Sequence, residues 1–119
     1  MKREVARLRR SFGYAWAGVR LLFGQERNAQ IHLALAVVAV LLAWWLDFST
    51  TEWALLALTI GVVIIAEAMN TAIETLTDLI SPDYHPRAKA VKDLAAGGVL
   101  LAAIMAVIVA LFLFLPKLL

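Results

Sequence analysis

The chain contains 119 residues, of which 63% are hydrophobic and 17% are charged. Soluble globular domains are about 45–50% apolar and about 25% charged, so the extra apolar side chains here must face lipid rather than water. The absence of cysteine excludes disulfide bonds, thiolate metal sites and thiol nucleophiles. The net charge of +2 is too small to favour a nucleic-acid partner. The sequence therefore predicts a small integral membrane protein, organised as a single domain over residues 1–119.

The N-terminal segment, residues 1–25, is predicted to form an amphipathic helix. Its apolar residues recur at intervals of three and four, which places them on one face of a helix and leaves the other face basic. Such a helix lies in the headgroup plane of a membrane rather than crossing it. The segment lacks the apolar core and the small-residue cleavage site of a secretory signal, so we expect it to be retained. Its basic residues are Lys2, Arg3, Arg7, Arg9, Arg10 and Arg20.

Three apolar stretches are predicted to cross the membrane: residues 29–47, 53–80 and 94–115. A bilayer core of about 30 Å needs about 20 helical residues. Backbone groups in lipid must form their hydrogen bonds within their own segment, so all three stretches are expected to be α-helical. Ser49 and Glu52 form a capping-box pattern that predicts the start of the second membrane helix. Pro86 is suited to the first turn of a basic helix that leads into the third.

The basic residues outside the membrane spans predict the orientation of the chain. Seven of the eleven Lys and Arg residues precede the first span, three more lie between the second and third spans, and none lies in the loop 47–52. Because basic loops stay on the cytoplasmic side, we expect the N-terminus and the second loop in the cytoplasm and the C-terminus outside.

The second span carries four polar residues that a membrane helix would normally exclude. They are spaced three, four and four residues apart, within an arc of about 80° on one helix face; they are Glu67, Asn70, Glu74 and Asp78. Hydrogen bonding between helices would explain a single asparagine, but ionisable groups inside a membrane usually mark a functional site. Glu67 lies about 17 Å deeper along the helix than Asp78. This polar stripe suits a reaction between a soluble substrate and a lipid.

Three further charged residues, Glu26, Lys92 and Asp93, are expected at the cytoplasmic end of the stripe. Carboxylates at this level can bind Mg²⁺ through oxygen ligands while the ion keeps phosphate oxygens and water. A lysine beside them can neutralise a transferring phosphoryl group, and a deeper carboxylate can accept the proton of a lipid hydroxyl. The chain has no glycine-rich phosphate loop of the GxxxxGKS or GxxxxGKT type. Any nucleotide must therefore bind at a site built at the membrane interface.

Three ordered motifs resemble those of the prokaryotic diacylglycerol kinase family. They are EAMNTAIE at 67–74 followed by Asp78, the Asp-Tyr-His and Ala-Val-Lys-Asp elements within 83–93, and Gly-Tyr-x-Trp-x-Gly-x-Arg at 13–20 followed by Glu26. The resemblance covers nearly the whole chain. It implies an ATP- and Mg²⁺-dependent lipid kinase of the bacterial plasma membrane. It also implies an all-α fold with a surface helix and three transmembrane helices, assembled as a homotrimer that shares its active sites between subunits.

The resemblance implies roles for individual residues as well. Glu67 is the expected general base, and Glu26 and Glu74 are the expected magnesium ligands, with Asn70 in their shell. The residues expected to contact ATP are Arg7, Tyr14, Glu26, Glu74, Asp78, His85, Lys92 and Asp93. The residues expected to contact the lipid are Trp45, Glu67 and Ala96.

The resemblance leaves two lipid substrates open. Arg27, His32 and the run Ala95–Val99 resemble the branch that phosphorylates undecaprenol, whereas the diacylglycerol branch tends to carry a serine in that run. Ala29-Gln30 departs from the Phe-Arg pair that is common in the undecaprenol branch. The small side chains of the run leave a groove without hydrogen-bonding groups, at the depth expected for Glu67, which suits a prenol with its single hydroxyl. We therefore expect undecaprenol as the substrate, with diacylglycerol as the alternative.

A subunit of an ion or proton transporter is the alternative from another functional class, with the polar stripe serving as a relay. This alternative accounts for the acids inside the membrane but not for the charged residues at their cytoplasmic end. A membrane scaffold would need no acids within the membrane. A lipid kinase accounts for both features.

Overall fold

The computed structural model describes all 119 residues and consists of four α helices joined by short connections. The helices are α1 (Lys2–Gln25), α2 (Arg27–Trp45), α3 (Thr50–Ile80) and α4 (Pro86–Leu118). The last three are long and apolar enough to cross a membrane, which confirms the prediction of an all-helical chain with three such helices. With 31 and 33 residues, α3 and α4 are about 46 and 50 Å long. Both exceed a bilayer core of about 30 Å, so their ends can reach water.

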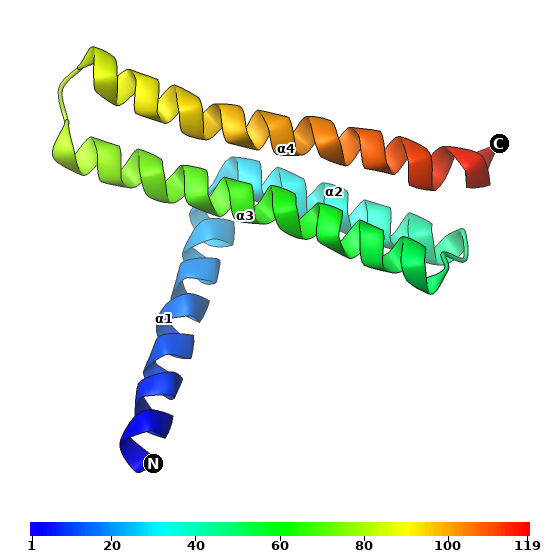
Figure 1. The fold of residues 1–119 in the computed structure, drawn as a ribbon, viewed down its shortest axis with the longest axis horizontal. Helices are drawn as coiled ribbons and strands as arrows, with labels where there is room; N and C mark the ends of the chain where they lie inside the picture. Colours follow the sequence, from blue (N-terminus) through cyan, green and yellow to red (C-terminus); the bar gives the residue numbers. More distant parts are fainter.

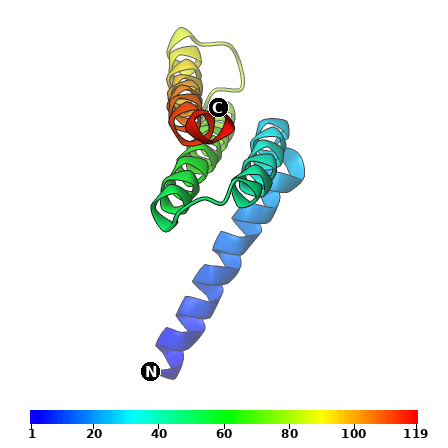
Figure 2. The same cartoon turned by 90° about the vertical axis from the view of Figure 1, so that its right-hand side faces the viewer.

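The helices form an antiparallel arrangement with one projecting arm. Helices α3 and α4 lie side by side along most of their length, and α2 packs against α3 (Figure 1). Helix α1 leaves the start of α2 at a steep angle and points away from the other three helices (Figure 2). Almost all of its side chains are exposed, including the apolar residues Val5, Leu8 and Phe12. Its predicted place on the membrane surface stays a prediction.

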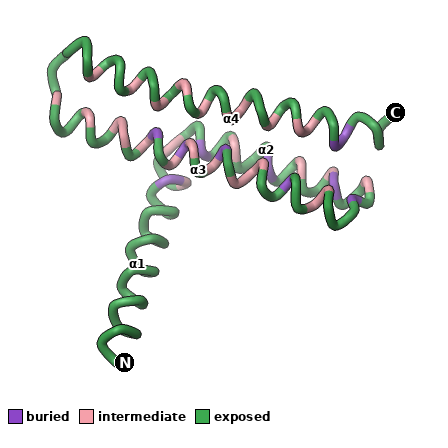
Figure 3. The backbone as a smooth tube through the Cα atoms, in the orientation of Figure 1, coloured by how far each residue is buried: buried purple, intermediate pink, exposed green.

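Only 11 of the 119 residues are buried, and they lie where the helices face one another (Figure 3). Large apolar side chains remain exposed along the outer faces of all three long helices; on α3 they include Leu58, Val62 and Ile65. An apolar surface of this extent is not stable in water. It therefore needs lipid or further protein around it.

A sharp turn ends α2 after Trp45, two residues before the predicted end of the first span. Asp47 has a φ of 59°, a left-handed conformation in which a helix cannot continue. The Asp47 N–H donates to the carbonyl of Trp44 at 3.3 Å, and the Phe48 N–H donates to the carbonyl of Ala43 at 3.2 Å. These two bonds satisfy carbonyl groups at the end of α2 in the pattern of a Schellman motif.

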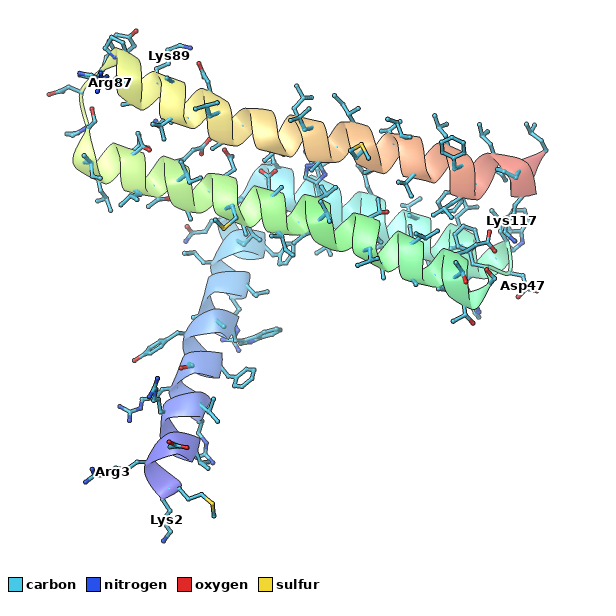
Figure 4. All side chains as sticks on the ribbon, in the orientation of Figure 1. Lys2, Arg3, Asp47, Arg87, Lys89 and Lys117 are labelled. Carbon is cyan, nitrogen blue, oxygen red and sulfur yellow. The ribbon has the colours of Figure 1, made fainter.

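The predicted capping box at the start of α3 is confirmed. The Glu52 N–H donates to Ser49 Oγ at 3.2 Å, and the Ser49 N–H donates to Glu52 Oε1 at 2.9 Å. Lys117 Nζ, near the end of α4, lies 3.2 Å from the same Glu52 oxygen. The sequence predicted no partner for Lys117, which lies beside the α2–α3 turn that carries Asp47 (Figure 4).

The ring of Phe48 fills the space between these helix ends. It packs against Phe114 and Trp53, with ring centroids 4.9 and 5.9 Å apart, and Lys117 Nζ lies 5.6 Å from its centroid. Phe48 belongs to a buried cluster with Ala43, Leu56, Leu113 and Phe114. This cluster joins the ends of α2, α3 and α4 that lie far from the polar stripe.

Replacing Ser49 with Ala is expected to lower the free energy of unfolding by about 1 kcal/mol, because the N–H of Glu52 loses its partner at the helix start. Denaturant unfolding in detergent micelles, followed by circular dichroism, measures the change. Thr51→Ala, an exposed change in the same helical turn, is the control. A Ser49 variant as stable as this control would contradict a stabilising role for the cap.

The opposite ends of α3 and α4 are joined by residues 81–85. His85 Nδ1 accepts a hydrogen bond of 3.1 Å from the Arg87 N–H, and Pro86 occupies the first turn of α4, as predicted. The basic segment and the third apolar span form one uninterrupted helix, with Arg87 and Lys89 near its start (Figure 4).

Candidate active site

The polar stripe of α3 passes from the interior of the helix packing to its exposed end. Glu67 is 2% exposed and Asn70 is 8% exposed, whereas Glu74 is half-buried and Asp78 is exposed. The sequence predicted this gradient from spacing along one helix. Packing against α2 and α4 now shows that the deepest carboxylate, Glu67, is enclosed by protein.

Glu67 meets an ionisable residue that the sequence analysis did not place in the site. His32 Nε2, on α2, lies 3.7 Å from Glu67 Oε2. That carboxylate oxygen is buried and accepts no hydrogen bond. The sequence signal that could have identified His32 as a site residue is its place within the first apolar span, since polar residues in membrane helices usually face other protein segments rather than lipid.

Two more polar side chains near Glu67 have unused hydrogen-bonding capacity. Asn70 Nδ2 donates to Glu74 Oε1 at 3.4 Å, but Asn70 Oδ1 is buried without a partner. Thr71 Oγ1, also missed by the sequence analysis, is buried without a partner as well. Buried polar atoms are normally hydrogen-bonded. Together with Glu67 Oε2, these atoms mark a place where a bound molecule can supply the missing partners.

The predicted nucleotide residues near the α3–α4 connection are engaged in ion pairs. Lys92 of α4 pairs with Asp78 of α3, and Lys89 pairs with Asp93 one turn along α4. The Lys92–Asp78 pair spans the two helices, whereas the Lys89–Asp93 pair is exposed and lies within one helix. Exposed pairs of this kind contribute little to stability, so they can open at small cost when a ligand binds.

Glu26, between α1 and α2, lies at about the same level as Glu74. It precedes His32 by six residues, about 9 Å along α2, and Glu74 follows Glu67 by seven residues, about 10 Å along α3. Because α2 and α3 are antiparallel and His32 meets Glu67, both displacements run in the same direction. The two carboxylates and the unpaired Oδ1 of Asn70 supply the hard oxygen ligands that Mg²⁺ prefers. Within one chain, however, no three acidic or histidine side chains converge closely enough to hold a metal ion.

Four other predicted site residues lie apart from Glu67. Arg7 and Tyr14 lie on the projecting helix α1, where they line a shallow basic hollow of about 650 Å³ with Lys2, Arg3 and Arg10. Trp45 is exposed at the far end of α2. His85 caps the start of α4. One chain therefore assembles only part of the predicted site.

Ala96 lies at a shallower level than the sequence analysis expected. The Lys92–Asp78 pair sets the register of the antiparallel helices α3 and α4. Four residues deeper on each helix, Ala96 is about level with Glu74, which is about 10 Å from Glu67. By the same register, Ala103 is the α4 residue about level with Glu67.

An apolar groove of about 280 Å³ leads away from Glu67 between α2, α3 and α4. Its lining runs from His32 and Val63, one helical turn from Glu67, to Phe114 at the other end. Thr59 is the only polar residue in the lining besides His32. The groove can take a hydrocarbon chain whose polar end lies beside Glu67.

The sequence pattern of the family described as prokaryotic diacylglycerol kinase matches residues 13–114. The chain belongs to this family. It is 49% identical over 110 residues to a diacylglycerol kinase of Synechocystis sp., a match that covers 92% of this chain and 63% of that protein. It is 40% identical over 117 residues to the undecaprenol kinase of Bacillus subtilis, covering 98% and 95% of the two chains. Identity to the diacylglycerol kinase of Escherichia coli is 34% over 102 residues, covering 86% and 84%.

The family and the names of these relatives indicate a lipid kinase, which confirms the predicted family and enzyme class. The chain spans less than two thirds of the Synechocystis protein but nearly all of the Bacillus subtilis protein. Their names differ in the lipid that is phosphorylated. Nothing in these comparisons supports the transporter alternative.

Proposed function

We propose that this chain transfers a phosphoryl group from ATP to the hydroxyl of a membrane lipid, and that the lipid is undecaprenol. The observation that carries the proposal is the position of Glu67, a buried carboxylate between an apolar groove and the charged ends of α3 and α4. A lipid chain in the groove brings its hydroxyl to Glu67. The charged end receives the phosphates, and membership of a lipid kinase family supports this division of the site.

In the proposed reaction, Glu67 accepts the proton of the lipid hydroxyl while the lipid oxygen attacks the γ-phosphorus of ATP. The bond between that phosphorus and the bridging oxygen breaks, and ADP leaves. General-base catalysis of this kind typically contributes about 10²–10⁴-fold to the rate. The burial of Glu67 keeps water, a competing acceptor, away from the reacting phosphoryl group.

Mg²⁺ would be held by Glu26 and Glu74, and Asn70 orients Glu74 through their hydrogen bond. The bound ion supplies positive charge against the phosphates. In this proposal the ammonium group of Lys92 leaves the Asp78 carboxylate and binds a phosphate oxygen instead, since the ion pair is partly exposed. Arg7, Tyr14, His85 and Asp93 complete the proposed nucleotide contacts.

A homotrimer with shared active sites would account for the predicted site residues that lie apart from Glu67 within one chain. Arg7 and Tyr14 belong to helix α1, which points away from the other three helices of its own chain (Figure 2). In the proposed trimer this helix reaches the site of a second copy. The exposed apolar faces of α2, α3 and α4 offer surface for that contact. We further propose that the trimer lies in the bacterial plasma membrane, with α1 on its cytoplasmic surface and the C-terminus outside.

The choice of lipid is tested by competition. With undecaprenol and diacylglycerol in the same micelles and Mg-ATP as donor, we expect a higher kcat/KM for undecaprenol. The Bacillus subtilis relative supports this choice, whereas the identity to the Synechocystis diacylglycerol kinase favours the alternative. A clear preference for diacylglycerol would overturn the choice of lipid while leaving the kinase proposal intact.

Ala103→Ser, in the lining of the apolar groove and about level with Glu67, is expected to narrow the gap between the kcat/KM values of the two lipids, because a serine hydroxyl can donate to the ester carbonyls that only diacylglycerol carries. The measurement is the ratio of kcat/KM values in the same competition assay. Ala96→Ser introduces the same group about level with Glu74, about 10 Å from Glu67 along the helix, and is expected to leave the ratio unchanged. A changed ratio for Ala96→Ser and an unchanged ratio for Ala103→Ser would place lipid recognition about two helical turns nearer the level of Glu74.

A further inference from the structure

We infer that His32 is a positioning residue for Glu67, holding its carboxylate in the orientation that accepts the proton of the lipid hydroxyl. The inference rests on the proposed function, because it assigns a partner to the proposed general base. It starts from a contact between α2 and α3 that connects residues 35 positions apart in the sequence.

The distance and the burial of the two side chains fit an interaction between one ring nitrogen of His32 and one carboxylate oxygen of Glu67. His32 Nε2 lies 3.7 Å from Glu67 Oε2, within ion-pair reach and less than about 1 Å beyond hydrogen-bond length. The Glu67 side chain is 2% exposed and the His32 side chain is 22% exposed. The pair is thus largely shielded from water, where a charge-assisted hydrogen bond is stronger than at the surface.

Glu67 has no other partner within the chain. Its Oε2 is buried and accepts no hydrogen bond, and no lysine or arginine pairs with it. The amide of Asn70, one turn away, donates to Glu74 instead. Helix α4 carries no ionisable residue between Asp93 and Lys117. His32 is therefore the single group of the chain in position to fix the direction of this carboxylate.

His32 also borders the place where the lipid hydroxyl is expected. Its ring lines the apolar groove that leads away from Glu67. Imidazole carries an N–H donor on one ring nitrogen in its neutral form and on both when protonated. A donor on Nε2 would bind the buried carboxylate oxygen at the groove's inner end, so the carboxylate would face the bound hydroxyl when the lipid arrives.

His32→Leu is expected to lower kcat for the lipid about 10- to 100-fold, since a displacement of about 1 Å at a reacting group can cost this much. The KM for Mg-ATP should stay within about twofold of the parent, because His32 lies about 9 Å from the level of Glu26. His32→Gln is expected to recover most of kcat, since its amide nitrogen can donate to the same oxygen. Ala34→Leu adds the same leucine to the opposite, exposed face of α2 and is expected to keep parental kcat.

The decisive measurement repeats His32→Leu in a Glu67→Gln background. If His32 acts through the Glu67 carboxylate, replacing His32 in this background causes no further loss of the residual rate, because the effects of residues that act as a unit are not additive. An equal fold-loss in both backgrounds, or parental kcat for a folded His32→Leu variant, would overturn the inference. A parent protein that phosphorylates no lipid overturns the proposed function itself, so the two failures are distinguishable.

Discussion

Glu67→Gln is expected to lower the rate of lipid phosphorylation by about 10²–10⁴-fold, the usual loss when a general base is removed. The amide keeps the size of the side chain and can still accept a hydrogen bond, but it cannot take the proton of the lipid hydroxyl. Glu67 is 2% exposed, so water has poor access to act in its place. The measurement is single-turnover transfer of labelled phosphate from ATP to undecaprenol in micelles. The KM for Mg-ATP should change little, because the nucleotide is expected at the level of Glu74.

The matched control is Glu52→Gln, the same change at the other end of α3. Glutamine can replace glutamate in a capping box, so this variant is expected to fold and to keep parental turnover. Size-exclusion chromatography and circular dichroism establish whether the Glu67 variant keeps the parental fold. Near-parental turnover by a well-folded Glu67→Gln protein would show that another group accepts the proton.

The second large effect concerns the metal. Glu74→Ala and Glu26→Ala are each expected to raise the Mg²⁺ concentration needed for half-maximal activity at least 10- to 100-fold, or to abolish activity. Both carboxylates lie at about the same level, and removing either would leave a bound ion with fewer hard ligands. Glu74→Ala also removes the acceptor of the Asn70 hydrogen bond, so its effect should be the larger. Activity measured against Mg²⁺ at fixed ATP gives the comparison.

Glu4→Ala, an exposed carboxylate near the start of α1, is the control for the loss of one negative charge. It is expected to show the Mg²⁺ dependence of the parent. Parental Mg²⁺ titrations for both site variants would mean that the ligands are assigned wrongly. Mixing Arg7→Ala with Glu67→Gln subunits adds a test of the assembly, because a site that takes Arg7 from a second copy is complete in some mixed trimers. No recovery on mixing would oppose sharing of the site between these two residues.

Features that depend on neighbouring residues were determined by the sequence alone. The three membrane helices follow from apolar runs long enough to cross a bilayer, since lipid leaves the backbone no other partners. The polar stripe of α3 follows from the fixed rotation per residue within one helix. The capping box at Ser49 and Glu52 needs only groups three residues apart. The family motifs are likewise local, and the comparisons confirm the family.

Features that depend on helix packing were decided only by the tertiary structure. The contacts of His32 with Glu67, of Lys92 with Asp78 and of Lys117 with Glu52 each join residues on different helices. Their existence depends on the rotation and register of one helix against another, which small differences in packing can change. The register of α3 and α4 also sets Ala96 about level with Glu74 rather than with Glu67. A sequence pattern specifies the face and depth of a residue along its own helix, whereas its partner is chosen by the shape and packing of the helices around it.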